Sequence, residues 1–155
     1  MPVVISSNLQ QTTDAAKRWL EEVSKMPLHG QARVVAMLGD LGSGKTTFVQ
    51  AVARELRIVE NVVSPTFVIE KIYHLLPPTQ RPGQAATSFE HLIHIDCYRL
   101  DNPQELQHLG WKEIAANERN LIMIEWADKI RRLLPPDHLT LNFKFVDEDT
   151  RNISW

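Results

Sequence analysis

A glycine-rich segment that directly follows an apolar run constrains this chain more than any other feature. Residues 32–38 read ARVVAML, and a run that is apolar on both faces is typical of a central parallel strand. Residues 39–46 read GDLGSGKT and match the phosphate-binding pattern G-x-x-x-x-G-K-[ST] at every fixed position. Residues 45–56 then carry apolar side chains at helical spacing. This order of strand, glycine loop and helix predicts a site for a nucleoside triphosphate.

The chemistry of this loop explains why these residue types stand at these positions. Glycines let backbone amides approach phosphate oxygens, and the amides lie at a helix start, where the helix dipole favours an anion. We expect Lys45 to reach the β- and γ-phosphates and the Thr46 hydroxyl to coordinate Mg²⁺. The residues predicted to contact the nucleotide here are Leu41, Gly42, Ser43, Gly44, Lys45, Thr46 and Thr47.

The rest of the chain alternates short strands and helices around this unit. The alternation predicts an α/β, three-layer fold of the P-loop NTPase kind, with a mostly parallel central sheet, an antiparallel edge and a C-terminal hairpin. The length of 155 residues predicts one domain over residues 1–155. Residues 75–88 are rich in proline and predict a mobile surface loop. We expect strands at 3–5, 67–73, 89–95, 121–124, 139–146 and 151–155, and helices from Thr12 or Thr13 to 26, at 104–109 and at 129–134.

Composition excludes several classes of protein. Lys and Arg number 17 against 19 Asp and Glu, and this formal charge of −2 argues against a protein that wraps nucleic acid by itself. The single cysteine, Cys97, excludes an internal disulfide and a cysteine-cluster zinc site. The chain shows no secretory signal at its start and no apolar run of the roughly 18 residues that span a membrane. We therefore expect a cytoplasmic protein without a membrane partner.

Two acidic residues end apolar strand-like segments and are candidates for the metal site. Asp96 follows residues 89–95, and Glu125 follows residues 121–124. Ligand sites in open α/β sheets lie at the carboxyl ends of strands, and Mg²⁺ takes one or two protein carboxylates. Either residue can bind the ion directly or through water, and the pattern alone does not decide between them.

Further candidates have two interpretations each. Thr66, in Ser64-Pro65-Thr66, lies where nucleotide switch loops are common and can sense the γ-phosphate or Mg²⁺, but composition alone favours a plain proline turn that enters a strand. Arg99 can contact phosphate or pair with a carboxylate, and Trp126 can stack on a base or pack. His91 and His94 would point to opposite faces of a strand, so we do not interpret them as a metal pair.

These motifs, in this order and over nearly the whole chain, resemble the TsaE (YjeE) family. Members are small P-loop ATPases of bacterial tRNA threonylcarbamoyladenosine synthesis. A P-loop alone occurs in many families, whereas the combination of blocks is highly specific. The matching blocks are GDLGSGKTT at 39–47, SPTF at 64–67, HIDCYRL at 94–100, QEL at 104–106 with Gly110, and EW at 125–126.

The resemblance implies roles for individual residues. It implies that Lys45 and the loop amides hold ATP phosphates and that Thr46 and Glu125 bind Mg²⁺. It places Asp96 beside the metal and phosphates as a catalytic or neighbouring carboxylate, and it favours Glu125 as the direct ligand. It makes Trp126 a functional residue. It also implies nucleotide contacts from the start of the N-terminal helix and from the C-terminal hairpin, where the matching residues are Thr13 and Arg151.

The resemblance further implies partners. A TsaE protein binds the TsaB and TsaD subunits and uses ATP to support their cycle, while TsaD transfers the threonylcarbamoyl group to the adenosine 3′ of the anticodon. This chain would therefore meet tRNA only indirectly. It departs from the family in its longer, proline-rich segment 75–88 and in Asn102, which stands where an aspartate is common.

Three other functions fit parts of the sequence. A small metabolite or nucleotide kinase shares the P-loop but needs a lid with phosphate-binding arginines, for which Arg119 and Arg131-Arg132 are the obvious candidates. A GTPase switch needs a guanine-reading N-K-x-D segment, which the sequence lacks. A module that binds ATP without hydrolysis has no need of Asp96 and Glu125.

Overall fold

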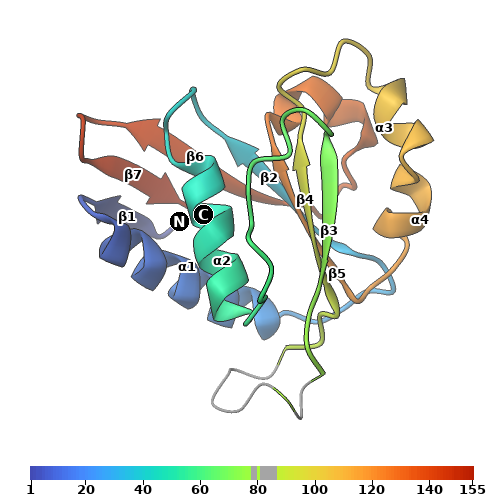
Figure 1. The fold of residues 1–155 in the computed structure, drawn as a ribbon, viewed down its shortest axis with the longest axis horizontal. Helices are drawn as coiled ribbons and strands as arrows, with labels where there is room; N and C mark the ends of the chain where they lie inside the picture. The colour runs from blue at the N-terminus through green and yellow to red at the C-terminus, as the bar shows by residue number, and fades with distance from the viewer. Residues whose placement is uncertain (78–79, 81–86) are drawn as a thin grey trace.

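A single seven-stranded sheet organises the part of the chain that the structure describes, residues 1–77, 80 and 87–155 (Figure 1). The structure is a computed structural model. Most of the predicted loop 75–88 falls outside the described residues. Across the sheet, the strands follow the order β1 (Val3–Ser6), β7 (Arg151–Ser154), β6 (Leu139–Phe145), β2 (Arg33–Leu38), β5 (Asn120–Glu125), β4 (His91–Asp96) and β3 (Glu70–His74).

The centre of the sheet is parallel and its edges are antiparallel. Strand β2 pairs in parallel with both β5 and β6, and β4 pairs in parallel with β5. Strand β3 is antiparallel to β4, and β7 is antiparallel to both β6 and β1. The pairing of β1 with β7 brings the two ends of the chain close together (Figure 1). This arrangement confirms the predicted α/β fold with an antiparallel edge and a closing hairpin.

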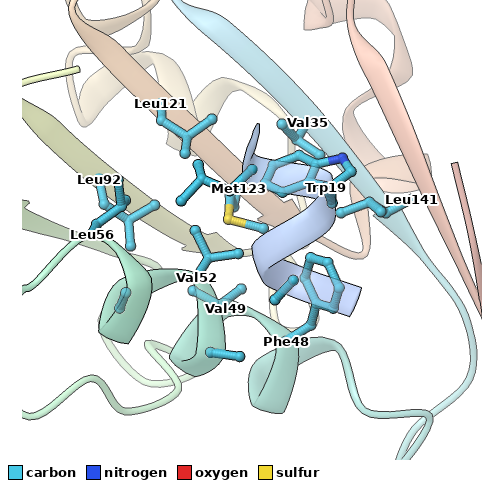
Figure 2. Close-up of a cluster of buried hydrophobic side chains, with 14 of the residues drawn as sticks. Trp19, Val35, Phe48, Val49, Val52, Leu56, Leu92, Leu121, Met123 and Leu141 are labelled. Atoms are coloured by element: carbon cyan, nitrogen blue, oxygen red, sulfur yellow. The ribbon is translucent and has the colours of Figure 1, made fainter. Parts of the chain in front are cut away.

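Two long helices cover one face of the sheet. Helices α1 (Leu9–Ser24) and α2 (Lys45–Glu55) lie side by side (Figure 1). Their apolar faces meet alternate residues of the strands, because successive strand side chains point to opposite faces. Figure 2 shows side chains of both helices facing those of the sheet. This buried cluster includes Trp19, Val35, Phe48, Val49, Val52, Leu56, Leu92, Leu121, Met123 and Leu141.

Three shorter elements cover the opposite face. They are α3 (Gln104–His108), α4 (Trp111–Ala115) and the 3₁₀ segment η2 (Ala127–Leu133). Their buried side chains pack on the other alternate residues of β2, β4 and β5. The parallel strands are thus covered on both sides, which explains why they are apolar throughout. None of the helices in the described ranges is long and apolar enough to cross a membrane.

The structure corrects several predicted boundaries. Helix α1 begins at Leu9 rather than at Thr12 or Thr13, because the Asn8 side chain accepts a hydrogen bond from the Gln11 amide and caps the helix. Strand β3 begins at Glu70 rather than at 67, because the backbone turns after Pro65, whose carbonyl accepts from the Ile69 amide at 2.6 Å. Helix α4 was not predicted, since its five residues are too few to show a helical period and no Asn-Pro pair precedes it, as one precedes α3.

Phe48 joins the two long helices to the sheet, and its truncation tests this packing. Its ring is 0% exposed and contacts Trp19 and Phe143 edge-on, at centroid distances of 5.7 and 5.5 Å. We predict that Phe48→Ala lowers the free energy of unfolding by about 3–5 kcal/mol in urea denaturation, since it leaves a cavity. Val59→Ala, at a side chain that is 83% exposed, should change it by less than about 0.5 kcal/mol. Similar losses in both variants would contradict the assigned core.

Candidate functional site

The glycine loop joins the end of β2 to the start of α2, and its first residue must be glycine. Gly39 has φ 150°, and a Cβ atom there would lie 2.4 Å from the Phe143 carbonyl oxygen on β6 and 2.8 Å from Ser43 Oγ. Gly44, at φ 98°, begins α2. The loop is therefore held against the neighbouring strand, with its amides at a helix N-terminus, as an anion site requires.

Lys45 folds back over this loop. Its Nζ donates to the carbonyl oxygens of Gly39 and Asp40 at 2.7 and 2.9 Å, and it lies 4.3 Å from the centroid of the Trp126 ring. The side chain is buried, and this loss of hydration lowers the pKa of Lys45, although the carboxylates of Glu125 and Asp96 partly oppose the shift. The ammonium group therefore lies in the site with neutral acceptors that a phosphate can replace.

Glu125 connects the loop helix to the sheet. The Thr46 hydroxyl donates to Glu125 Oε1 at 2.7 Å, across 79 residues of sequence. His94 Nε2 lies 2.8 Å from the same oxygen. The pair predicted to bind Mg²⁺, Thr46 and Glu125, is thus already in contact, at the end of β5.

Asp96 connects the sheet to the segment predicted to be a switch. Its Oδ2 accepts hydrogen bonds from the hydroxyls of Thr66 and Ser64, at 2.8 and 3.2 Å. Its Oδ1 accepts from the Tyr98 amide at 2.8 Å. Strand register places Asp96 directly beside Glu125. The two carboxylates therefore lie side by side but have different partners, the loop helix for one and the 64–66 segment for the other.

These groups line one cavity of about 280 Å³, which we call the carboxylate cavity. In the described ranges, no three His, Cys, Asp or Glu side chains gather closely enough to hold a metal ion by themselves. A divalent ion here would need oxygens from phosphate or water in addition to those of the protein, as Mg²⁺ commonly does. The lining residues are Leu41, Gly42, Ser43, Gly44, Lys45, Thr46, Thr47, Ser64, Thr66, Asp96, Tyr98, Glu125 and Trp126.

Two residues that had alternative interpretations take definite positions. Trp126 adopts a left-handed backbone, with φ 57°, and turns its ring towards Lys45 and towards Tyr98, whose ring centroid is 5.1 Å away. Trp126 therefore packs and lines the cavity at once. The Arg99 guanidinium lies 4.5 Å from the centroid of the exposed Phe67 ring.

A second cavity of about 380 Å³, which we call the hairpin cavity, lies on the other side of the glycine loop. It is lined by the start of α1, by residues 42–44 and by the β6–β7 turn. Arg151 lies here, and its Nε donates to the Gly42 carbonyl at 3.1 Å. On α1, however, it is Thr12 that lines the cavity, whereas the Thr13 hydroxyl donates to the Leu9 carbonyl.

Sequence reasoning missed three residues of the site. Ser64 and Tyr98 line the carboxylate cavity, and His94 contacts Glu125 below it. Each lies in one of the sequence blocks that carry the family resemblance, so membership of those blocks could have marked these residues as candidates for the site. The spacing of His91 and His94 argues against a metal pair, but it gives no information about a contact between His94 and a carboxylate on the adjacent strand.

Comparison with known proteins shows to which family the chain belongs. Residues 6–153 match the model of the family described as threonylcarbamoyl adenosine biosynthesis protein TsaE. The chain belongs to the TsaE family. The tRNA threonylcarbamoyladenosine biosynthesis protein TsaE of Bacillus subtilis is 35% identical over 124 residues, which cover 79% of this chain and 68% of the relative. Its counterpart in Treponema pallidum is 29% identical over 150 residues, covering 97% and 96%.

A solved structure extends the TsaE comparison to three dimensions. The crystal structure of Bacillus subtilis YdiB matches with a TM-score of 0.68 and 27% identity, covering 98% of this chain and 82% of that chain. The fold and the family therefore agree over nearly all of the sequence.

The first glycine of the loop provides a test of the site's geometry. We predict that Gly39→Ala lowers the free energy of unfolding by roughly 2 kcal/mol or more in urea denaturation, because the new Cβ meets backbone that cannot move aside. Gly30→Ala is the matched control. Gly30 also has positive φ, 77°, but no atom lies within 4 Å of the added Cβ, so only about 1–2 kcal/mol of backbone strain is expected. An effect at Gly39 no larger than at Gly30 would contradict the close contact with β6.

Proposed function

We propose that this TsaE protein binds ATP with Mg²⁺ and hydrolyses it slowly as an accessory subunit of tRNA threonylcarbamoyladenosine synthesis. One observation carries the proposal. The Lys45 ammonium and the Thr46–Glu125 pair face the same cavity at the mouth of a phosphate-binding loop. A cation and a hydroxyl–carboxylate pair at a helix N-terminus are the groups that a magnesium-bound triphosphate requires.

The residues present fit Mg²⁺. Two oxygens at adjacent corners of an octahedron with bonds of about 2.0–2.1 Å lie about 3 Å apart. Thr46 Oγ1 and Glu125 Oε1 are 2.7 Å apart, so both can hold one ion with little movement. Phosphate oxygens and water would complete the ligand set. The bound ion would neutralise charge that develops on the phosphates.

Lys45 and Asp96 take complementary roles in this proposal. Phosphate oxygens offer Lys45 charge-assisted hydrogen bonds, which are stronger than those it makes with the loop carbonyls. Asp96 lies beside Glu125, close enough to reach the ion through water or to orient the attacking water. Because Asp96 also accepts from Thr66 and Ser64, it connects the phosphate site to the 64–66 segment, a candidate switch.

The hairpin cavity would receive the remainder of the nucleotide. It adjoins the loop on the side away from Asp96 and Glu125, and Arg151 and Thr12 line it together with Glu148 and Asp149 of the β6–β7 turn. A nucleotide whose phosphates lie on the loop would extend its base and ribose in this direction. We propose Arg151 as a nucleotide contact and Thr12, in place of Thr13, as its partner on α1.

We propose that TsaB and TsaD are the protein partners and that TsaD carries out the transfer to tRNA. This chain would meet tRNA only through that complex, and the pathway would place it in the cytoplasm. A metabolite kinase fits less well. Its candidate arginines lie elsewhere, since Arg119 pairs with Glu90 and Arg131 and Arg132 are exposed on η2.

Reconstitution with the two partner subunits tests the proposal. Modification of tRNA by TsaB and TsaD should be sustained with ATP only when this chain is added. Lys45→Ala should abolish nucleotide binding and reduce the supported rate by about 100-fold or more, because the phosphate-facing charge is lost. Glu125→Ala should reduce Mg²⁺-dependent hydrolysis more than nucleotide binding. Lys17→Ala, at an exposed lysine of α1, is the matched control and should behave as wild type.

Each arm has an outcome that contradicts part of the proposal. Equal modification without this chain would refute the accessory role even if ATP binds. Unchanged ATPase rates in both site variants would refute the site assignment. Phosphorylation of a free metabolite would favour a kinase.

A further inference from the structure

His94 is a buried polar residue to which the proposed reaction assigns no role. The side chain is 0% exposed and lies on β4, on the sheet face that packs against α2. Its Nε2 lies 2.8 Å from Glu125 Oε1. Its Nδ1 has no hydrogen-bond partner among the described residues. Burying an imidazole nitrogen without a hydrogen-bond partner costs free energy. Such a group in a native structure calls for an explanation, and a function of the contact with Glu125 would supply one.

The Glu125 carboxylate determines the role of the His94 ring in this contact. An ionised carboxylate only accepts hydrogen bonds, so Nε2 is the ring nitrogen that donates to Glu125. Glu125 Oε1 thus accepts two hydrogen bonds, one from His94 Nε2 on β4 and one from the Thr46 hydroxyl on α2. Each carboxylate oxygen offers about two lone-pair sites, so both sites of Oε1 are occupied here; an ion held by Thr46 Oγ1 and Glu125 Oε1 would take the site of the Thr46 hydroxyl proton, while the ring keeps the other.

We infer that His94 is a positioning residue that holds the Glu125 carboxylate against Thr46 and so prepares both for the divalent ion. The inference rests on the proposed function and deepens it. Without the ring, the carboxylate is free to adopt other rotamers, and the ion would have to order it on binding. Side chains that orient metal ligands commonly change metal affinity by about 10–100-fold when removed.

The chain provides a matched control on the same strand. His91 also hydrogen-bonds a side chain of β5, with Nδ1 3.0 Å from Asn120 Oδ1. It lies three residues before His94, so its side chain points to the other face, and neither cavity that flanks the loop includes it. A histidine bridge between β4 and β5 therefore occurs both at the site and away from it.

The experiment measures how much Mg²⁺ improves nucleotide binding. For each variant of the full chain, calorimetry gives the dissociation constant of a non-hydrolysable ATP analogue with Mg²⁺ and with EDTA, and their ratio is the Mg²⁺-dependent gain. We expect His94→Leu to lose about tenfold or more of that gain while metal-free binding stays within about twofold of wild type. We expect His94→Gln, whose amide N–H reaches about as far as Nε2, to retain the gain within about threefold. His91→Gln should match wild type.

The outcomes separate this inference from the proposed function. A wild-type protein that binds no analogue overturns the proposed function, and the inference with it. A full gain in His94→Leu, or equal losses in His94→Leu and His94→Gln, overturns the inference alone. If His94→Leu does not fold, His94→Asn, whose shorter amide cannot reach Glu125, replaces it and should show the same loss.

Discussion

The hydrogen bond from Thr46 to Glu125 is the contact on which the site depends. It joins the first turn of α2 to the end of β5 and so helps to set the distance between the glycine loop and the two carboxylates. Two packing features maintain that distance. Phe48, two residues further along α2, is buried between Trp19 and Phe143, and Gly39 lets the loop lie directly on the β6 backbone. The apolar core therefore sets the geometry of the polar site.

The two carboxylates are alike in chemistry and neighbours in the sheet, yet their surroundings separate them. Glu125 is tied to rigid elements, α2 and the β4 strand, through Thr46 and His94. Asp96 is tied to the 64–66 segment, whose apolar neighbours Phe67 and Val68 are exposed. Under the proposed function, this difference suits Glu125 as a fixed metal ligand and Asp96 as a carboxylate that responds to the state of the nucleotide. It also gives a physical reason why the sequence alone did not distinguish them.

Local sequence patterns predicted the central part of the fold. The apolar run ending at Leu38, the glycine loop and the apolar strand ending at Glu125 were predicted from sequence because each is continuous in the chain. The predicted start of α1 was wrong because Asn8 caps the helix, which therefore begins at Leu9, three or four residues before Thr12 or Thr13. The contact of His94 with Glu125 depends on strand register across 31 residues, which no local period reveals. The resemblance named Thr13 as a nucleotide contact, and of these two neighbouring threonines it is Thr12 that lines the hairpin cavity.

A titration of magnesium ATP into the purified chain tests the central claim most directly. The account predicts binding at one site, weakened when EDTA removes the ion and lost when alanine replaces Lys45. The absence of measurable affinity for any magnesium-bound nucleoside triphosphate would contradict it.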